Sequence, residues 1–440
     1  MRYIPNTSAD RREMLDRVGL DSVDALFADV PQAVRERFHP LGLEPQSELD
    51  VAEHASRLAA ENQAASMTSF AGGGIYDHYV PSAVWNLASR SEFVTAYTPY
   101  QPEISQGTLV AMFEFQTLIA ELTGMEVANA SLYDGATALA EAALMAERIR
   151  KRGRVAVARS LLPHLRRVLQ TYAWGAGITL HEVPYDASGR CDLAGVPEDV
   201  SGLILQSPNA FGVIESLEGV KDRIGDALLI VSAYPISLGL LEPPGSFDAD
   251  VVVGEGQSLG LPMAYGGPLL GLFATREAHL RQIPGRIAGQ TVDANGETGY
   301  VMAAQTREQH IRRNRATSNI CTNSALCALA ATIYLSSVGA EGLRTVAELC
   351  ASKAHALAER IRRIDGFELP FDGPFFNEFV VRTPEDPEQV RTRLANAGFL
   401  VESSGELASL GVNRSLRLAV TERRTEDEID RLIDVLGGGS

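Results

Sequence analysis

Residues 249–262 read ADVVVGEGQSLGLP, an apolar run of strand length that opens into a polar, glycine-rich loop. Two runs of the same kind precede it, GLILQSPN at 202–209 and ALLIVSAY at 227–234. Near-continuous apolar strands are typical of a parallel sheet that is covered on both faces. Helical patterns such as PHLRRVLQTYAW, residues 163–174, alternate with strand patterns. The sequence therefore predicts an α/β fold with a mostly parallel central sheet and helices on both faces.

Three parts follow one another along the chain, whose 440 residues are too many for one ordinary core. Residues 1–65 carry helical apolar spacing and are expected to form a helical N-terminal arm. Residues 66–325 hold the apolar strands and are expected to form a large domain. Residues 326–440 begin with a long helical stretch and then alternate strand and helix patterns, which predicts a small α+β C-terminal domain of normal size.

Composition excludes several classes of protein. A net charge of −17 argues against non-specific nucleic-acid binding, which needs a basic surface. The first residues lack the apolar core of a secretory signal, and the apolar stretches look too short to span a membrane. The four cysteines are scattered and form no CxxC pair, so a zinc site is not expected. Reduced thiols and the absence of a signal predict a cytoplasmic protein.

Residues 95–107 read TAYTPYQPEISQG and form the most distinctive loop. Its prolines restrict the backbone and would hold the polar side chains in fixed positions, which suits a site that needs donors placed in advance. A rigid structural loop is the alternative. The candidate catalytic residues of this loop are Tyr97, Tyr100, Gln101, Glu103 and Ser105.

A second candidate site is the start of the helix predicted in SLYDGATALAEAA, residues 131–143. The amides of Gly135, Ala136 and Thr137 would point outward from the helix N-terminus and form a cradle for an anion. The alternative is an ordinary helix capped by Asp134, whose charge would also repel a phosphate.

Two further segments carry polar residues whose roles stay open. Thr317 and Asn319 lie between a basic run and a long helical stretch, close to the expected pocket, although Thr317 or Ser318 could equally cap that helix. The three glycines at 72–74 would let the backbone approach a ligand closely, and Asp77 and His78 follow them. Asp77 and His78 are candidate acid–base groups, and the alternative for His78 is a packed, hydrogen-bonded histidine beside tyrosines.

The glycine-rich loop after residue 253 resembles the loop that carries a lysine in many enzymes that bind pyridoxal phosphate (PLP). Here Gln257 stands where an amine would be useful, and an amide cannot replace it. The chain has three lysines, Lys151, Lys221 and Lys353, and each is expected to be a solvated surface charge.

Together these segments resemble the P-protein family of the glycine cleavage system, and within it subunit 1 of the split bacterial form. The resemblance rests on motifs that occur in the expected order: RYIPNTSADRREML (2–15), GGGIYDHYVPSAV (72–84), YTPYQPEISQG (97–107), SLYDGATALAEAALMA (131–146), GEGQSLGLPMAYGGP (254–268) and ATSNICTN (316–323). It spans almost the whole chain.

The resemblance implies the aminotransferase-like fold of type I PLP enzymes. It also implies that subunit 2 holds PLP through its own lysine, which aligns with Gln257, and that the two subunits form an α2β2 assembly. That assembly decarboxylates glycine and passes an aminomethyl group to the lipoyl arm of the H-protein. One departure is Tyr234, which precedes Pro235 where the family more often has an acidic residue.

Two other functions stay open at this point. The chain could be an inert scaffold that only stabilises its partner, or an independent PLP enzyme that uses one of its three lysines. The second alternative is weakened because none of these lysines follows a strand.

Overall fold

The computed structural model describes residues 5–39, 41–95, 97–264 and 266–438. The chain divides into two compact units, residues 1–65 and 66–440. The described helical segments of the first unit are α1 (Ser8–Val18), η1 (Val23–Phe27), α2 (Gln32–Arg35), α3 (Glu48–Ala60) and η2 (Gln63–Ser66), which begins there. Thr7 and Ser47 cap α1 and α3 with capping boxes. No residue of these segments is buried, so the described part of this unit has no core of its own.

A seven-stranded sheet organises the second unit, in the order β2-β8-β7-β6-β5-β3-β4. The pairs β4-β3, β3-β5, β5-β6 and β6-β7 are parallel, and β8 is antiparallel to both β7 and β2. The strands are β2 (Val127–Ala128), β3 (Arg154–Ala158), β4 (Thr179–Val183), β5 (Gly202–Ser207), β6 (Leu228–Ala233), β7 (Val251–Glu255) and β8 (Gly271–Thr275). The prediction of a mostly parallel central sheet is confirmed.

Helices cover both faces of this sheet. Successive residues of a strand point to opposite faces, so an apolar strand has side chains to bury on each face. On one face Leu229 of β6 packs in a core with residues of α6 (Gln106–Thr123) and α11 (Ala325–Ile361). On the other face Ile230 packs with residues of α7 (Gly135–Arg150) and α8 (Pro163–Ala176). Helix α11 is long and apolar enough to cross a membrane by length and composition. Fully buried residues such as Ala330 and Tyr334 place it in the core of this unit.

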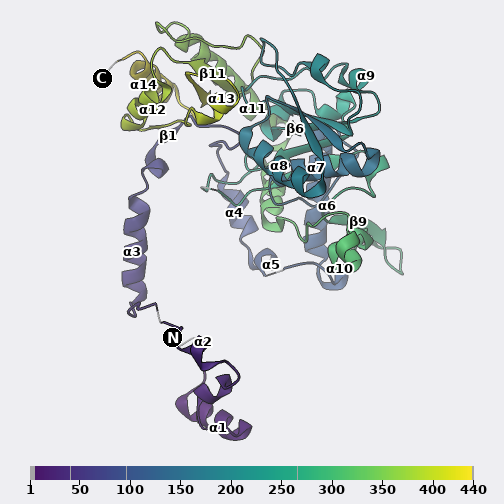
Figure 1. Cartoon of the computed structure of the whole chain (residues 1–440), viewed down its shortest axis with the longest axis vertical. Helices are drawn as coiled ribbons and strands as arrows, with labels where there is room; N and C mark the ends of the chain where they lie inside the picture. Colours follow the sequence, from purple (N-terminus) through teal and green to yellow (C-terminus); the bar gives the residue numbers. More distant parts are fainter. Residues whose placement is uncertain (1–4, 40, 96, 265, 439–440) are drawn as a thin grey trace. The chain divides into compact units, whose positions relative to one another are not determined.

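The C-terminal part of this unit forms a smaller layer. Strands β11 (Glu378–Arg382) and β13 (Ser415–Ala419) pair antiparallel, and α12 (Pro387–Asn396) and α14 (Glu426–Leu436) lie beside them (Figure 1). Strand β12 (Phe399–Leu400) pairs in parallel with β1 (Thr68–Ser69). This pairing brings the glycine-rich segment after β1 against the C-terminal layer. A domain boundary near residue 325 stays a prediction, since α11 contributes to the cores of both layers.

The structure differs from the sequence-based expectations in two places. Strands β9 (Ile287–Val292) and β10 (Thr298–Ala303) form an antiparallel hairpin that the sequence analysis did not predict. Helix α11 begins at Ala325 after Ser324, so the prediction that Thr317 or Ser318 caps it is wrong. The other short elements that bear on the site are α4 (Ser82–Ala88), α5 (Ser91–Val94), η3 (Pro102–Ile104), α10 (Gln309–Arg312) and α13 (Gly405–Ser409).

Candidate functional site

A cavity of about 360 Å³ lies at the carboxyl ends of the central parallel strands. Gln206 of β5, Ser232 of β6 and Glu255 of β7 line it, together with Gly135 at the start of α7. Ligands bind at this edge of open α/β sheets, because the strand ends and helix N-termini converge there. The glycines at 72–74, which the sequence analysis singled out, form part of the same wall.

The start of α7 is already occupied by carboxylates of this chain. Asp134 caps the helix: its side chain accepts hydrogen bonds from the Thr137 amide at 2.7 Å and the Thr137 hydroxyl at 3.1 Å. Glu255 accepts a hydrogen bond from the Gly135 amide at 2.9 Å. The predicted cradle therefore exists as backbone geometry, but the amides of Gly135 and Thr137 already bond to carboxylates of this chain.

Two more amides bond to the same glutamate. Its Oε1 accepts hydrogen bonds from the amides of Gln257 at 3.0 Å and Leu270 at 2.9 Å. Burial raises the pKa of Glu255 to about 7, and the three backbone hydrogen bonds oppose that rise. Glu255 was not among the predicted site residues. Its position as the last residue of a buried strand was the available signal.

Gln257 cross-links the backbone instead of reaching into the cavity. Its side chain is buried, its Oε1 accepts a hydrogen bond from the Tyr76 amide at 3.0 Å, and its Nε2 donates to the Leu261 carbonyl at 2.8 Å. An amide can both accept and donate in this way, whereas a lysine ammonium can only donate. The residue at the expected lysine position thus has a structural role here.

The three lysines lie away from the cavity, and each has another environment. Lys151 is the exposed C-cap of α7. Lys221 is paired with Asp250 at 2.7 Å. Lys353 donates to the carbonyls of Glu422 and Arg424, both at 2.6 Å. The expectation of solvated surface charges is wrong for Lys221 and Lys353, which are partly buried. The described residues around the cavity therefore do not fit PLP bound covalently to this chain.

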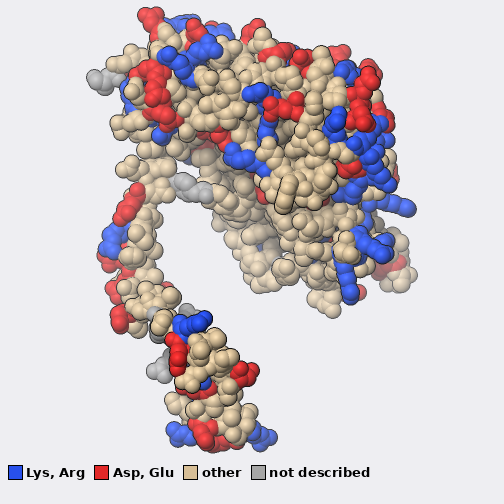
Figure 2. Space-filling view, in the orientation of Figure 1, with Lys and Arg blue, Asp and Glu red and all other residues tan. Residues whose placement is uncertain are grey.

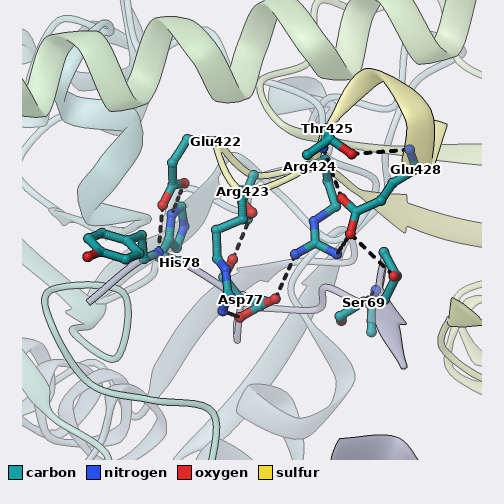
Figure 3. Close-up of polar contacts among 12 residues, drawn as sticks. Ser69, Asp77, His78, Glu422, Arg423, Arg424, Thr425 and Glu428 are labelled. Carbon is teal, nitrogen blue, oxygen red and sulfur yellow. Dashed lines mark hydrogen bonds and ion pairs between the residues drawn. The ribbon is translucent and has the colours of Figure 1, made fainter. Parts of the chain in front are cut away.

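Tyr234, the residue that departs from the family pattern, belongs to a buried chain of hydrogen bonds. Its hydroxyl bonds to His78 Nε2. His78 Nδ1 in turn bonds to Glu422 Oε2 at 2.6 Å (Figure 3). Burial raises the pKa of Tyr234 well above its usual range. Burial would also raise the pKa of Glu422, but the hydrogen bond and charge of His78 outweigh it and lower that pKa. The cluster joins the cavity wall to the C-terminal layer.

Asp77 has a similar joining role. It pairs with Arg423 and, at 2.9 Å, with Arg424 Nη2, while its carbonyl accepts a hydrogen bond from Thr421 Oγ1 at 2.7 Å (Figure 3). Both acid–base candidates of this segment, Asp77 and His78, thus hold the glycine-rich segment against the C-terminal layer.

The predicted catalytic loop 97–105 does not line this cavity. Tyr97 is 80% exposed and Tyr100 is 56% exposed. Gln101 and Glu103 are exposed as well, and Ser105 precedes α6 as its N-cap residue. Ala96, within the quoted segment, lies outside the described residues. Four of the five predicted catalytic side chains of the loop are therefore exposed, whereas Pro99 between them is buried.

The neighbours of this loop come from distant parts of the sequence. The guanidinium carbon of Arg286 lies 5.9 Å from the centre of the Tyr100 ring, and the His310 ring is 6.4 Å away. Arg286 Nη1 donates to the hydroxyls of Thr98 at 3.2 Å and Thr322 at 2.9 Å. Tyr97 borders a separate apolar pocket of about 150 Å³ that also involves Leu326. The loop therefore lies beside the segment that leads into α11.

Thr317 and Asn319 lie elsewhere on that segment. The Thr317 amide donates to the Arg307 carbonyl at 3.1 Å, and Asn319 hydrogen-bonds Tyr172 of α8. Neither residue lines the cavity at the strand ends. The structure thus places the site residues predicted from sequence in separate groups: the cradle residues Gly135 and Ala136 at the cavity, and the exposed loop and the 317–319 segment outside it.

Comparisons with known proteins agree with this architecture. The family described as "Glycine cleavage system P-protein" matches residues 1–436. A "Probable glycine dehydrogenase (decarboxylating) subunit 1" from Moorella thermoacetica is 50% identical over 100% of this chain and 99% of its own length. A relative of the same name from Thermotoga maritima is 53% identical over 87% of each chain.

A solved structure shows the same fold over the whole chain. The crystal structure of a glycine decarboxylase (P-protein) of the glycine cleavage system, in inhibitor-bound form, is similar with a TM-score of 0.92 and 44% identity. The similarity covers 100% of both chains. The fold is that of type I PLP-dependent enzymes, as predicted. From the full-length family match, the identities of about half and the shared fold, it follows that this chain belongs to the P-protein family of the glycine cleavage system.

Proposed function

We propose that this chain is the lysine-free subunit of a split glycine decarboxylase and that it acts only together with a second, PLP-bearing subunit. One observation carries the proposal. The cavity at the strand ends has the backbone of a cofactor site, but the residue at the lysine position, Gln257, is tied to Tyr76 and Leu261. A complete enzyme of this family then needs an amine from a partner. The relatives' designation as "subunit 1" supports the existence of that partner.

The partner contacts the exposed apolar surface around α5 and the loop that follows it. Val94, Tyr97, Tyr100, Ile104 and Leu326 are all large apolar side chains with at least 40% of their surface exposed. The surface over α4 and α5 carries few charges (Figure 2). Val94, Tyr97 and Leu326 border one apolar pocket, and exposed apolar surface of this kind marks an interaction site. We assign it to subunit 2 in an α2β2 assembly.

In that assembly, loop 97–105 extends into the partner's active site. PLP, bound by subunit 2, supplies the electron sink for decarboxylation. The residues of this chain position the reactants: the hydroxyls of Tyr97 and Tyr100 orient the glycine carboxylate or the lipoyl arm of the H-protein. Pro99 and Pro102 hold the loop so that Gln101, Glu103 and Ser105 enter the shared site with little loss of conformational freedom. Thr317 and Asn319 are assigned to its rim.

The expected compartment is the cytoplasm. All four cysteines are free, and three of them are buried. Reduced thiols of this kind persist in a reducing compartment.

The experiment measures glycine-dependent release of carbon dioxide in the presence of lipoylated H-protein. Each subunit is assayed alone and then with the other. Release by the mixture, and by neither chain alone, is the expected result. Decarboxylation by this chain alone, with a borohydride-reducible PLP adduct, would refute the proposal in favour of an independent PLP enzyme.

A second function, an inert scaffold, is favoured by one observation. The cavity-lining carboxylate of Glu255 and the amides that bond to it are satisfied within this chain. The double variant Tyr97→Phe/Tyr100→Phe separates the two functions. A positioning role predicts a large loss of turnover in a complex that still assembles, checked by size-exclusion chromatography with light scattering. Tyr79→Phe, which removes another exposed hydroxyl, is the control. Unchanged turnover in the double variant would leave only the scaffold function.

A further inference from the structure

Three backbone amides from separate parts of the chain converge on one side chain. The Gly135 amide comes from the first turn of α7, the Gln257 amide from the loop after β7, and the Leu270 amide from the segment before β8. All three donate to the carboxylate of Glu255 at 2.9–3.0 Å. Helix α7 has 16 residues, so its N-terminus carries the partial positive charge that favours anions. This is the geometry of an anion site, and a carboxyl group of the protein itself occupies it.

The first turn of α7 also lies close to the backbone of Glu255. A Cβ atom added to Gly135 would lie 2.9 Å from the Glu255 nitrogen and 3.0 Å from its Cα. Real Cβ atoms essentially never come within 3.0 Å of another atom, so even an alanine would not fit at this position without a shift. The first turn of α7 therefore packs directly against the end of β7, and a phosphate group could reach the amide only by displacing the Glu255 side chain.

The charges around the cavity also disfavour a phosphate. Asp134, Glu402 and Glu406 line the cavity together with Glu255. Arg417 is paired with Glu402 at 2.6 Å and does not itself line the cavity. No lysine is among the described lining residues. His164 also lines the cavity, but burial lowers the pKa of its imidazole and so disfavours its charged form. A phosphate dianion at this site of the wild-type chain would therefore lie near several carboxyl groups with little positive charge to offset them, which costs energy at low local dielectric.

We infer that the Glu255 carboxyl group fills a phosphate site, so that the strand-end cavity of this chain is closed to phosphate and phosphate esters. The inference deepens the proposed function, because it gives a physical reason why the chain's own residues exclude PLP even without a covalent bond. It makes a claim of its own: removing the Glu255 side chain opens an anion site that accepts inorganic phosphate.

The test uses the full-length chain alone and inorganic phosphate as the probe, with isothermal titration calorimetry as the readout. Wild type is expected to show no binding that exceeds that of chloride. Glu255→Ala is expected to bind phosphate at least ~10-fold more tightly than wild type, which corresponds to ~1.4 kcal/mol. Asp134→Asn, which removes a neighbouring negative charge but leaves Glu255 in place, is expected to gain no such binding.

Two results would overturn the inference: phosphate binding by wild type that matches the Glu255→Ala variant, or a folded Glu255→Ala variant that gains nothing. If that variant does not fold, hydrogen–deuterium exchange on wild type decides. Phosphate is expected to leave exchange unchanged in peptides that cover 131–137 and 256–270, and slower exchange there would refute the inference. None of these measurements uses enzyme activity or subunit 2, so a failure of the proposed function is scored separately.

Discussion

Replacing Arg417 by methionine should destabilise the protein strongly and in a pH-dependent way. Arg417 lies on β13 and is 1% exposed. Its Nε and Nη2 both approach Glu402 at 2.6 Å, its Nη1 donates to the Ala210 carbonyl at 2.9 Å, and Glu378 lies 3.7 Å away. Methionine has similar bulk but no charge, so the substitution tests the electrostatic role of Arg417 with little change in packing.

The magnitude follows from the carboxylates that would be left behind. Glu402 is partly exposed and can turn toward water, but Glu378 is 2% exposed and cannot. Removing one partner of a buried ion pair costs about 3–5 kcal/mol. Because one of the two carboxylates can be hydrated, we expect a loss of about 3 kcal/mol at pH 8.

The pH dependence is the sharper part of this prediction. Burial raises the pKa of Glu378 to about 7 even though the Arg417 charge lowers it. Without Arg417 that pKa rises further, so the carboxyl of the variant is neutral at pH 5.5 and its burial costs little. The folded-state pKa lies above the unfolded one, so the difference between wild type and variant is small at low pH and grows as pH rises. At pH 5.5 the loss of stability should fall to about 1 kcal/mol, because the variant still lacks the hydrogen bonds that Arg417 donates.

Urea unfolding followed by circular dichroism at pH 5.5 and pH 8 measures both losses. The double variant Glu378→Gln/Arg417→Met removes the buried charge and should recover part of the stability at pH 8. A loss under about 1 kcal/mol at pH 8 would refute the reasoning, since it lies below the range for broken buried pairs. So would an equal loss at both pH values.

Three other predictions concern local features of the fold. Gly212→Ala should lower the free energy of unfolding by over ~3 kcal/mol, because Gly212 has a φ of +78° and its added Cβ would meet the Glu378 carbonyl oxygen at 1.7 Å. Gly219→Ala is the control: Gly219 has a φ of +72° but no atom within 4 Å of the added Cβ, so the loss should be about 1 kcal/mol in the same urea assay. Equal losses in the two variants would contradict the steric account. Glu422→Gln should lower the free energy of unfolding by about 2 kcal/mol at neutral pH, because a charge-assisted hydrogen bond to the buried His78 is lost. Since the pKa of Glu422 is lowered in the folded state, the stability difference between wild type and variant should shrink as the pH falls. A stability difference in thermal melts that does not change with pH would argue against this pair. The pKa of Asp250 is lowered to about 2, because hydrogen bonds from His279, Lys221 and a backbone amide outweigh its burial. The stability that this carboxylate contributes should therefore be lost as the pH falls from about 4 to 2. An Asp250→Asn variant with the same acid-melting curve as wild type would refute this.

The sequence by itself determined the architecture and the family. The apolar runs at 202–209, 227–234 and 249–254 became β5, β6 and β7, because a strand buried on both faces leaves a near-continuous apolar run that can be read from neighbouring residues alone. The hairpin at 287–303 escaped prediction, because its residues are mostly polar or partly exposed and lack such an apolar run. The absence of a lysine at position 257 was also evident from sequence.

The tertiary structure alone decided which polar groups meet. Glu255 and Gly135 are 120 residues apart, and His78 and Glu422 are 344 residues apart, yet each pair shares a hydrogen bond. No local pattern encodes such contacts, because they depend on strand order, on the register of the sheet and on the β1-β12 pairing. For the same reason the sequence could not show how its two candidate sites are placed, and only the fold shows that the exposed loop 97–105 does not line the strand-end cavity.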